Sequence, residues 1–225
     1  MTAASLSLPD DRWAELAVRF NLAPFDYMHD SWLENFANRD LLRALEPHRA
    51  AGSRLSRHLL EILNLHDRFF VDFSEPRSRL ALLDSASLEN LLLYTGLALR
   101  AEEIRKLLDG AQVAKLRKIL GAGAFEFAAK QVPLLGGVPE FAYEPGHREP
   151  RGRLILIGAL FALSRGAWSN PAYARRLVLR LPRDLSQDLL SPWPEPANNT
   201  ENGKLPGLMT RLIKEFIAPW HPLFA

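Results

Sequence analysis

The stretch FDYMHDSWL, residues 25–33, contains three side chains that could do chemistry together. Asp26, His29 and Asp30 stand at positions i, i+3 and i+4, a spacing that gathers side chains on one face of an α-helix. Two carboxylates and an imidazole so arranged could bind a metal ion or exchange protons with a substrate. The same nine residues also hold five large apolar or aromatic side chains. The segment could therefore equally be a helix that packs into a core.

We expect the packed helix. If residues 24–36 form one helix, with proline at the favoured first position, five apolar side chains point in one direction: Phe25, Met28, Trp32, Leu33 and Phe36. His29 then lies inside this face, Asp26 and Asp30 lie at its edge, and Tyr27 points away. A metal site needs its ligands around an open pocket and further ligands from elsewhere. The pattern instead predicts that one ring nitrogen of His29 bonds to a neighbouring carbonyl or carboxylate.

The remaining motifs do not assemble a catalytic set. His58 and His66, followed by Asp67, would lie on the same side of a helix but roughly 12 Å apart along its axis, too far to share a metal ion. GAGAFE, residues 121–126, is half of a dinucleotide fingerprint, but it follows a helical pattern rather than a strand. We predict no catalytic residue, cofactor or metal ion, and expect that the protein is not an enzyme. An enzyme whose acids and histidine converge from distant segments stays an alternative.

Charge is unevenly distributed along a chain whose net charge is only +2. Residues 10–46 hold eight acids against four arginines, and residues 145–183 hold eight arginines against one acid. Such asymmetry can steer a partner or can hold two faces of one fold together. We expect arginines to line one side of a helix opened by Pro171, and the candidate partner-binding residues are Arg175, Arg176, Arg180 and Arg183. The alternative is a nucleic-acid-binding helical module that uses the same arginines.

The predicted fold is mostly α, an irregular multi-helix bundle with little or no sheet, because helical periodicity dominates and strict alternation is nearly absent. Residues 68–76 are the best extended piece. Gly110 and Pro133 are each expected to end a helix. We expect one domain over residues 1–225, with a loop at about 134–150 and a proline-rich linker at about 191–207.

Composition places the chain among globular proteins of a reducing compartment. The 225 residues are 48% hydrophobic and include no cysteine, which excludes disulfides and thiolate chemistry. The longest apolar run, Leu154–Leu163, is half the length of a membrane-spanning helix, about 20 residues, so it predicts a buried core helix. The N-terminus shows no signal-peptide pattern, and we expect the protein in the cytoplasm.

Four segments, in order, resemble the SctK family of bacterial type III secretion, with its YscK- and PscK-like members. RFNLAPFDYMHDSWL (residues 19–33) resembles the family's early proline and Tyr-x-His signature followed by Trp-Leu. Residues 88–121 resemble its central leucine-rich pair of helices. ARRLVLRLP (residues 174–182) resembles its arginine-rich segment, and residues 208–224 resemble its closing helix and Leu-Phe end.

The resemblance implies a mostly helical, non-enzymatic accessory protein of the cytoplasmic sorting platform. Family members lie beneath the inner-membrane ring. They contact the cytoplasmic forkhead-associated domain of SctD on one side and the pod protein SctQ on the other. SctQ links them indirectly to the stator SctL and the ATPase SctN. The implied location is the cytoplasmic face of the inner membrane, without insertion into it.

Overall fold

The computed structural model describes residues 10–35, 39–45, 48–107, 109–142, 146, 149–163, 166–190 and 205–224. Within these ranges it contains twelve α-helices and no strand, which confirms the mostly α prediction. The helices are α1 (Asp10–Leu22), α2 (Arg39–Leu45), α3 (Arg49–Ile62), α4 (Ser85–Leu99), α5 (Ala101–Arg105), α6 (Gly110–Leu120), α7 (Ala122–Glu126), α8 (Val132–Leu135), α9 (Pro150–Ala162), α10 (Pro171–Val178), α11 (Arg183–Leu190) and α12 (Gly207–Phe216).

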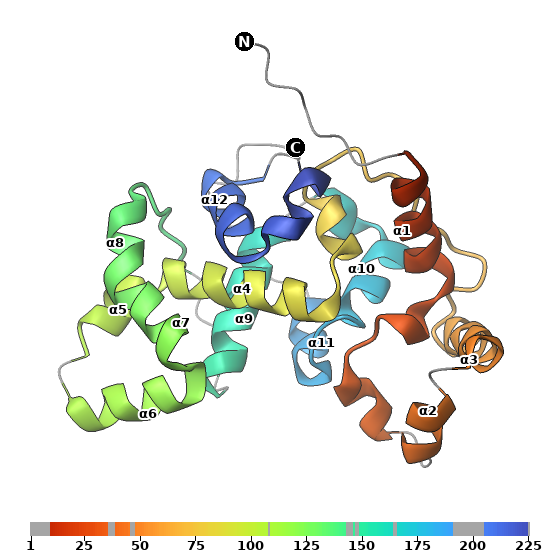
Figure 1. The fold of residues 1–225 in the computed structure, drawn as a ribbon, viewed down its shortest axis with the longest axis horizontal. Helices are drawn as coiled ribbons and strands as arrows, with labels where there is room; N and C mark the ends of the chain where they lie inside the picture. The colour runs from red at the N-terminus through yellow and green to blue at the C-terminus, as the bar shows by residue number, and fades with distance from the viewer. Residues whose placement is uncertain are drawn as a thin grey trace, which may run out of the picture.

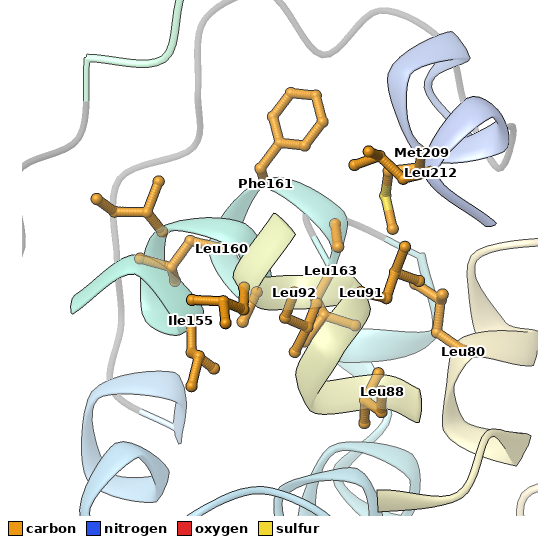
Figure 2. Packing of buried hydrophobic residues seen from close by; sticks show 14 of the residues in the cluster. Leu80, Leu88, Leu91, Leu92, Ile155, Leu160, Phe161, Leu163, Met209 and Leu212 are labelled. Carbon is orange, nitrogen blue, oxygen red and sulfur yellow. The ribbon is translucent and has the colours of Figure 1, made fainter. Parts of the chain in front are cut away.

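The crossing of α4 and α9 forms the centre of the molecule (Figure 1). The run predicted to be a buried helix is buried at every position from Leu154 to Leu163. Two glycines let the backbones approach. A Cβ at Gly96 would collide with the carbonyl group of Leu154, and a Cβ at Gly158 with that of Leu92. Buried side chains of α4 and α9 belong to one cluster with Met209 and Leu212 of α12 (Figure 2).

The other helices flank this crossing on opposite sides. In Figure 1, α5–α8 lie to the left, whereas α1, α2 and α3 lie to the right. One buried cluster nevertheless runs from Phe20 in α1 to Leu223 near the C-terminus. Within the described residues, no helix has both the length and the apolar content needed to span a membrane.

The helical segment α5–α8 departs from two predicted boundaries. Gly110 does not end a helix but begins α6, where the side chain of Asp109 accepts a hydrogen bond from the backbone N–H of Ala111 and caps the helix. Pro133 does not stop the preceding helix. A π-helical turn at Phe127–Gln131 widens the backbone ahead of it, and helical structure continues to Leu135. Proline has no backbone N–H to donate to the carbonyl oxygen four residues earlier. The π-helical turn already departs from that hydrogen-bond pattern, so the proline is tolerated there.

The segment FDYMHDSWL is not the single helix that we predicted. It forms two short 3-10 turns, Pro24–Asp26 and Asp30–Asn35. The backbone N–H of His29 donates to the carbonyl oxygen of Leu179 at 2.7 Å instead of to a carbonyl within the segment. This long-range bond interrupts the helical ladder.

Residues 68–74 are non-helical, as predicted, and contain no strand. The side-chain amide of Asn21 exchanges two hydrogen bonds with the backbone of Phe70 and fixes this segment. The predicted loop at 134–150 is irregular over 136–142, after α8. Most of the predicted linker, residues 191–204, lies outside the described residues.

Candidate functional site

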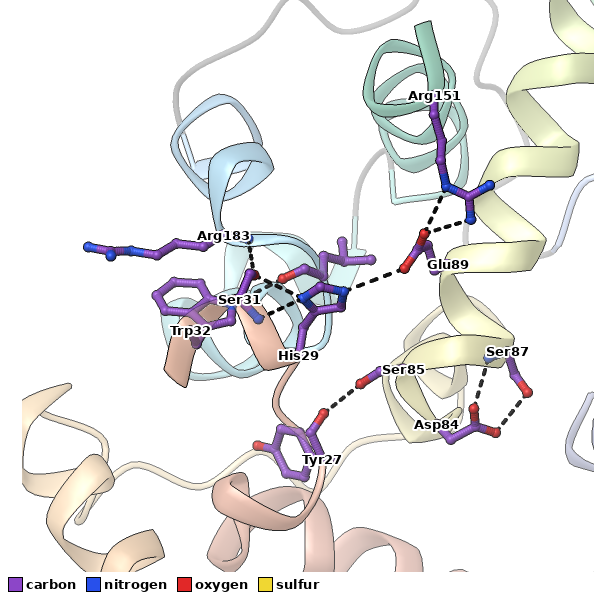
Figure 3. A network of polar contacts seen from close by, with 11 residues as sticks. Tyr27, His29, Ser31, Trp32, Asp84, Ser85, Ser87, Glu89, Arg151 and Arg183 are labelled. Carbon is purple, nitrogen blue, oxygen red and sulfur yellow. Dashed lines mark hydrogen bonds and ion pairs between the residues drawn. The ribbon is translucent and has the colours of Figure 1, made fainter. Parts of the chain in front are cut away.

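His29 connects the N-terminal segment to α4 and α9 through a chain of polar contacts (Figure 3). Its Nε2 lies 3.6 Å from Oε2 of Glu89, and Oε1 of Glu89 accepts a 2.8 Å hydrogen bond from the guanidinium of Arg151. The hydrogen bond from His29 and the pairing with Arg151 hold the pKa of Glu89 below its usual range, against the opposite effect of burial. One ring nitrogen of His29 thus faces a carboxylate, one of the two predicted kinds of partner, at ion-pair rather than hydrogen-bond distance.

The other ring nitrogen of His29 faces Ser31. Nδ1 lies 2.8 Å from the hydroxyl oxygen of Ser31 and accepts a 3.1 Å hydrogen bond from the backbone N–H of the same residue. Because Nδ1 accepts that N–H, Nε2 carries the ring proton and donates toward Glu89. Serine, imidazole and carboxylate thus stand in the order of an acyl-transfer triad.

The hydroxyl of Ser31 is held for a structural purpose. Its oxygen accepts a 2.9 Å hydrogen bond from the backbone N–H of Arg183. Neither Ser31 nor His29 lines the groove between α1 and α3, the pocket beside Arg180, or the pocket between α5 and residues 136–142. The arrangement therefore fastens two segments that lie far apart in sequence.

Asp26, His29 and Asp30 do not form one site. His29 is part of the network, whereas Asp26 and Asp30 are exposed on separate turns. Tyr27, predicted to point away, is buried, and its hydroxyl donates to the carbonyl oxygen of Phe20. Within the described residues, no group of three or more histidine, aspartate or glutamate side chains is placed to hold a metal ion.

The predicted exposed row of arginines is wrong for Arg176 and Arg180. Arg176 is 0% and Arg180 3% exposed. Helix α10 ends at Val178, so the i,i+4 spacing does not place both on one helical face. Arg176 donates to the carbonyl oxygens of Ala172, Asn21 and Leu65. It therefore joins α10 to the N-terminal segment and to the loop after α3.

Arg175 and Arg183 are the two candidate arginines that reach the surface. Arg175 donates to the carbonyl oxygen of Leu63 at 3.2 Å, and the guanidinium of Arg183 lies 5.8 Å from the ring centroid of Trp32. The indole N–H of Trp32 in turn donates to the carbonyl oxygen of Leu181. The N-terminal and arginine-rich segments thus pack on one another, mainly through hydrogen bonds to backbone groups rather than through ion pairs.

A second basic surface, which the arginine pattern does not predict, is formed by lysines. Four of the six lysines lie between residues 106 and 130: Lys106, Lys115, Lys118 and Lys130. Lys106 pairs with Glu102 and Lys130 with Glu126. Lys115 and Lys118 are exposed on α6 and form no ion pair within the described part of the chain. Counting lysine separately from arginine would have found this surface.

A groove of about 880 Å³ separates α1 from α3. Val18 and Leu22 line it and are 56% and 50% exposed, among charged neighbours such as Arg19 and Arg57. Partly apolar grooves with charged rims are common at sites of protein contact. The chain therefore presents an apolar groove at one end and the lysines of α6 at the other.

Comparison with known proteins identifies a family, which the contacts alone do not. The sequence model of the family described as "YOP proteins translocation protein K (YscK)" matches residues 16–223. No curated protein and no solved structure matches the chain significantly.

Proposed function

We propose that this protein is a non-enzymatic adaptor of the sorting platform. The premise is that the chain belongs to the YscK family, which is the SctK family of type III secretion. In this proposal it joins the cytoplasmic forkhead-associated domain of SctD to the pod protein SctQ. It thereby lies at the cytoplasmic face of the inner membrane without inserting, and SctQ links it indirectly to SctL and SctN. The family match over nearly the whole chain is the observation that carries the proposal.

The arrangement of exposed groups supports an adaptor with two docking surfaces. The lysine-bearing helix α6 lies at the left end of Figure 1, and α10 and α11, which carry Arg175 and Arg183, lie on the other side of the α4–α9 crossing. The helices between them share one buried cluster. A rigid body with separated contact surfaces is what a protein needs in order to hold two partners at a fixed spacing.

Size-exclusion chromatography with light scattering tests the proposal directly. The protein is mixed with the SctD cytoplasmic domain and, separately, with SctQ, both encoded by the same genome. We expect a stable complex with each partner and a ternary complex with both. Absence of any complex at tens of micromolar, a concentration that reveals complexes with dissociation constants of up to about 10 µM, would contradict the adaptor assignment.

Charge reversal then assigns each surface. We expect one of two double variants, R175E/R183E or K115E/K118E, to weaken binding to one partner by at least about tenfold, a change of about 1.4 kcal/mol. Each variant serves as the matched control for the other. Because all four side chains are exposed, both variants should keep the wild-type melting temperature. Unchanged affinities for both partners would show that neither surface docks.

The nucleic-acid alternative loses two of the arginines on which it depended, because Arg176 and Arg180 are buried. We do not propose it. Steep salt-dependent binding to a DNA or RNA duplex, measured by fluorescence anisotropy, would restore it.

A further inference from the structure

A small pocket of about 260 Å³ lies where α1, the turn after Pro24, the N-terminus of α4 and the C-terminal 3-10 turn meet. Leu16, Met28 and Leu82 supply apolar wall, and Arg180 contributes its guanidinium. Tyr27, Asp84 and Ser85, which also line the pocket, lie near one another in Figure 3. Ser85 donates to the carbonyl oxygen of Tyr27 at 2.6 Å, so this side of the pocket is fixed.

Arg180 is a buried cation with few partners. Its Nη1 donates to the carbonyl oxygen of Leu83 at 2.6 Å, and its Nε has no hydrogen-bond partner. Burial lowers the pKa of Arg180 to about 10, so the side chain still carries its charge at neutral pH. Among the described residues Arg180 forms no direct ion pair, although the carboxylate of Asp84 in the same pocket stabilises its charge through space. A guanidinium has five N–H donors, and buried charges in proteins are normally paired.

Contacts with Tyr27 offset only part of this cost. The guanidinium carbon of Arg180 lies 4.0 Å from the centroid of the Tyr27 ring, a favourable cation–π geometry. The Nε of Arg176 also has no partner, but the two terminal nitrogens of Arg176 donate to three carbonyl oxygens, as expected of a structural buried arginine. Arg180 has one such bond and lines a pocket, which is the arrangement of a receptor group.

The charges around the pocket restrict what Arg180 can receive. The carboxylate of Asp84 is already engaged, because it accepts hydrogen bonds from Ser87 and from the indole N–H of Trp220. Arg19 binds the carbonyl oxygen of Asp26 at the exposed side of the pocket. Two aspartates near the pocket repel a doubly charged anion more than a singly charged one. The apolar wall favours a short hydrocarbon stem.

We propose that this pocket binds a single carboxylate on a short aliphatic stem, with the Arg180 guanidinium as its receptor. The fork of N–H groups matches the two oxygens of a carboxylate. Such a group is carried by the side chain of a glutamate on a partner protein and by a free short-chain acid. The proposal stands independently of which proteins the adaptor joins.

Titration of the whole protein with sodium propionate tests the pocket without any partner. Arginine side-chain Nε–H signals are followed by ¹H–¹⁵N NMR at constant ionic strength, with sodium chloride as the reference salt, and R180K assigns the Arg180 signal. We expect that signal alone to shift saturably with propionate, while the Arg176 signal stays in place. Absence of a saturable shift by about 100 mM, or an equal shift in chloride or phosphate, would overturn the proposal.

Two phenylalanine variants test the location of the pocket while Arg180 stays in place, so the result does not depend on the folding of an Arg180 variant. L16F places extra volume in the pocket, whereas V18F adds the same ring at an exposed position of the same helix. We expect L16F to abolish the propionate shift and V18F to retain it, with both proteins folded. Retained binding in L16F would contradict the location. A dissociation constant below about 100 µM would assign the pocket to a free acid, and a millimolar one to a partner's side chain within a larger interface.

Discussion

Adjacent arginines have different roles in this chain, and backbone geometry decides which. Arg175 and Arg176 follow one another in α10, but only Arg176 points into the core. There it donates to the carbonyl oxygen of Ala172 in its own helix and to those of Asn21 and Leu65 in other segments. The i,i+4 spacing suggested a basic face for Arg176 and Arg180, yet both side chains are buried, and Arg176 connects separate segments of the fold. Residue type and spacing alone do not distinguish a solvated guanidinium from a buried one.

Replacing each of the two neighbours by glutamine separates these roles. We expect R176Q to lower the free energy of unfolding by roughly 2–4 kcal/mol, because three carbonyl oxygens lose a charged donor in a buried site. R175Q removes one exposed contact and should cost at most about 1 kcal/mol. Urea unfolding followed by circular dichroism measures both. Equal losses in the two variants would refute the assignment of Arg176 as the internal tie.

The network at Glu89 predicts a pH dependence of stability. The folded-state pKa of Glu89 is depressed below its ordinary value of 4.5, first by the hydrogen bond from His29. A depressed carboxyl pKa contributes stability that is complete above the unfolded pKa and is lost as the pH falls through the folded pKa. We therefore expect E89Q to be less stable than wild type at pH 7 and the difference to shrink progressively below about pH 4.5.

Urea unfolding at a series of pH values from neutral to acid checks the Glu89 prediction. E102Q is the control, because Glu102 is exposed and pairs only with Lys106 at i,i+4. It should follow the wild-type curve within a few tenths of a kcal/mol. A constant difference between E89Q and wild type across the whole range would mean that Glu89 contributes by packing and not by its charge.

At the scale of elements, the crossing of α4 and α9 depends on two missing side chains. A Cβ at Gly96 or Gly158 would meet backbone carbonyl groups of the facing helix, which cannot move aside as a side chain could. We expect G96A and G158A each to cost roughly 3 kcal/mol or more, beyond the usual cost of overpacking. G123A is the control: it lies in α7 with open space around it and should be neutral or stabilising by up to about 1 kcal/mol.

Thermal and urea unfolding of the three alanine variants provide the measurement. If G96A and G158A keep wild-type stability, the backbones of α4 and α9 lie far enough apart to leave room for a Cβ at each glycine.

Helices were predictable where local patterns and packing agree. The apolar run of α9 and the broad apolar face of α12 specify buried helices by themselves. The segment at residues 24–36 was misjudged because the backbone of His29 bonds to Leu179, more than a hundred residues away. Gly110 was misjudged because Asp109 caps the helix that follows it. Long-range hydrogen bonds and caps of this kind are invisible to periodicity.

The candidate site was predictable only in part for the same reason. An imidazole placed among apolar groups predicted a carbonyl or carboxylate partner for His29, but nothing near it in sequence identifies Glu89 or Arg151 as members of its network. The pocket at Arg180 combines residues from five separate stretches of the chain. Its existence depends on tertiary packing, so the sequence offered only the arginine itself.

At the scale of the whole molecule, buried contacts link segments from both ends of the chain. Phe20 stacks with Tyr27 and packs against Phe73 and Tyr173, and Arg176 binds the backbone of the N-terminal segment. Within the described residues, a large buried cluster includes residues of α1, α4, α9 and α12, and two smaller clusters lie around the N-terminal segment and α3. Removing either end would expose groups that the rest of the fold has buried. This arrangement favours a molecule that folds as one unit and carries its docking surfaces rigidly.

We therefore expect a single cooperative unfolding transition. Four tryptophans, at positions 13, 32, 168 and 220, lie in separate parts of the described chain, so their fluorescence reports on the core as a whole. Far-UV circular dichroism reports on the helices, including the flanking segment α5–α8. Coincident urea transitions from the two probes are the expected result, since two-state unfolding requires it. If circular dichroism instead shows an earlier transition that fluorescence lacks, α5–α8 unfolds separately. The lysines of α6 would then belong to a segment that moves relative to the rest, and a fixed spacing between two partners would need another explanation.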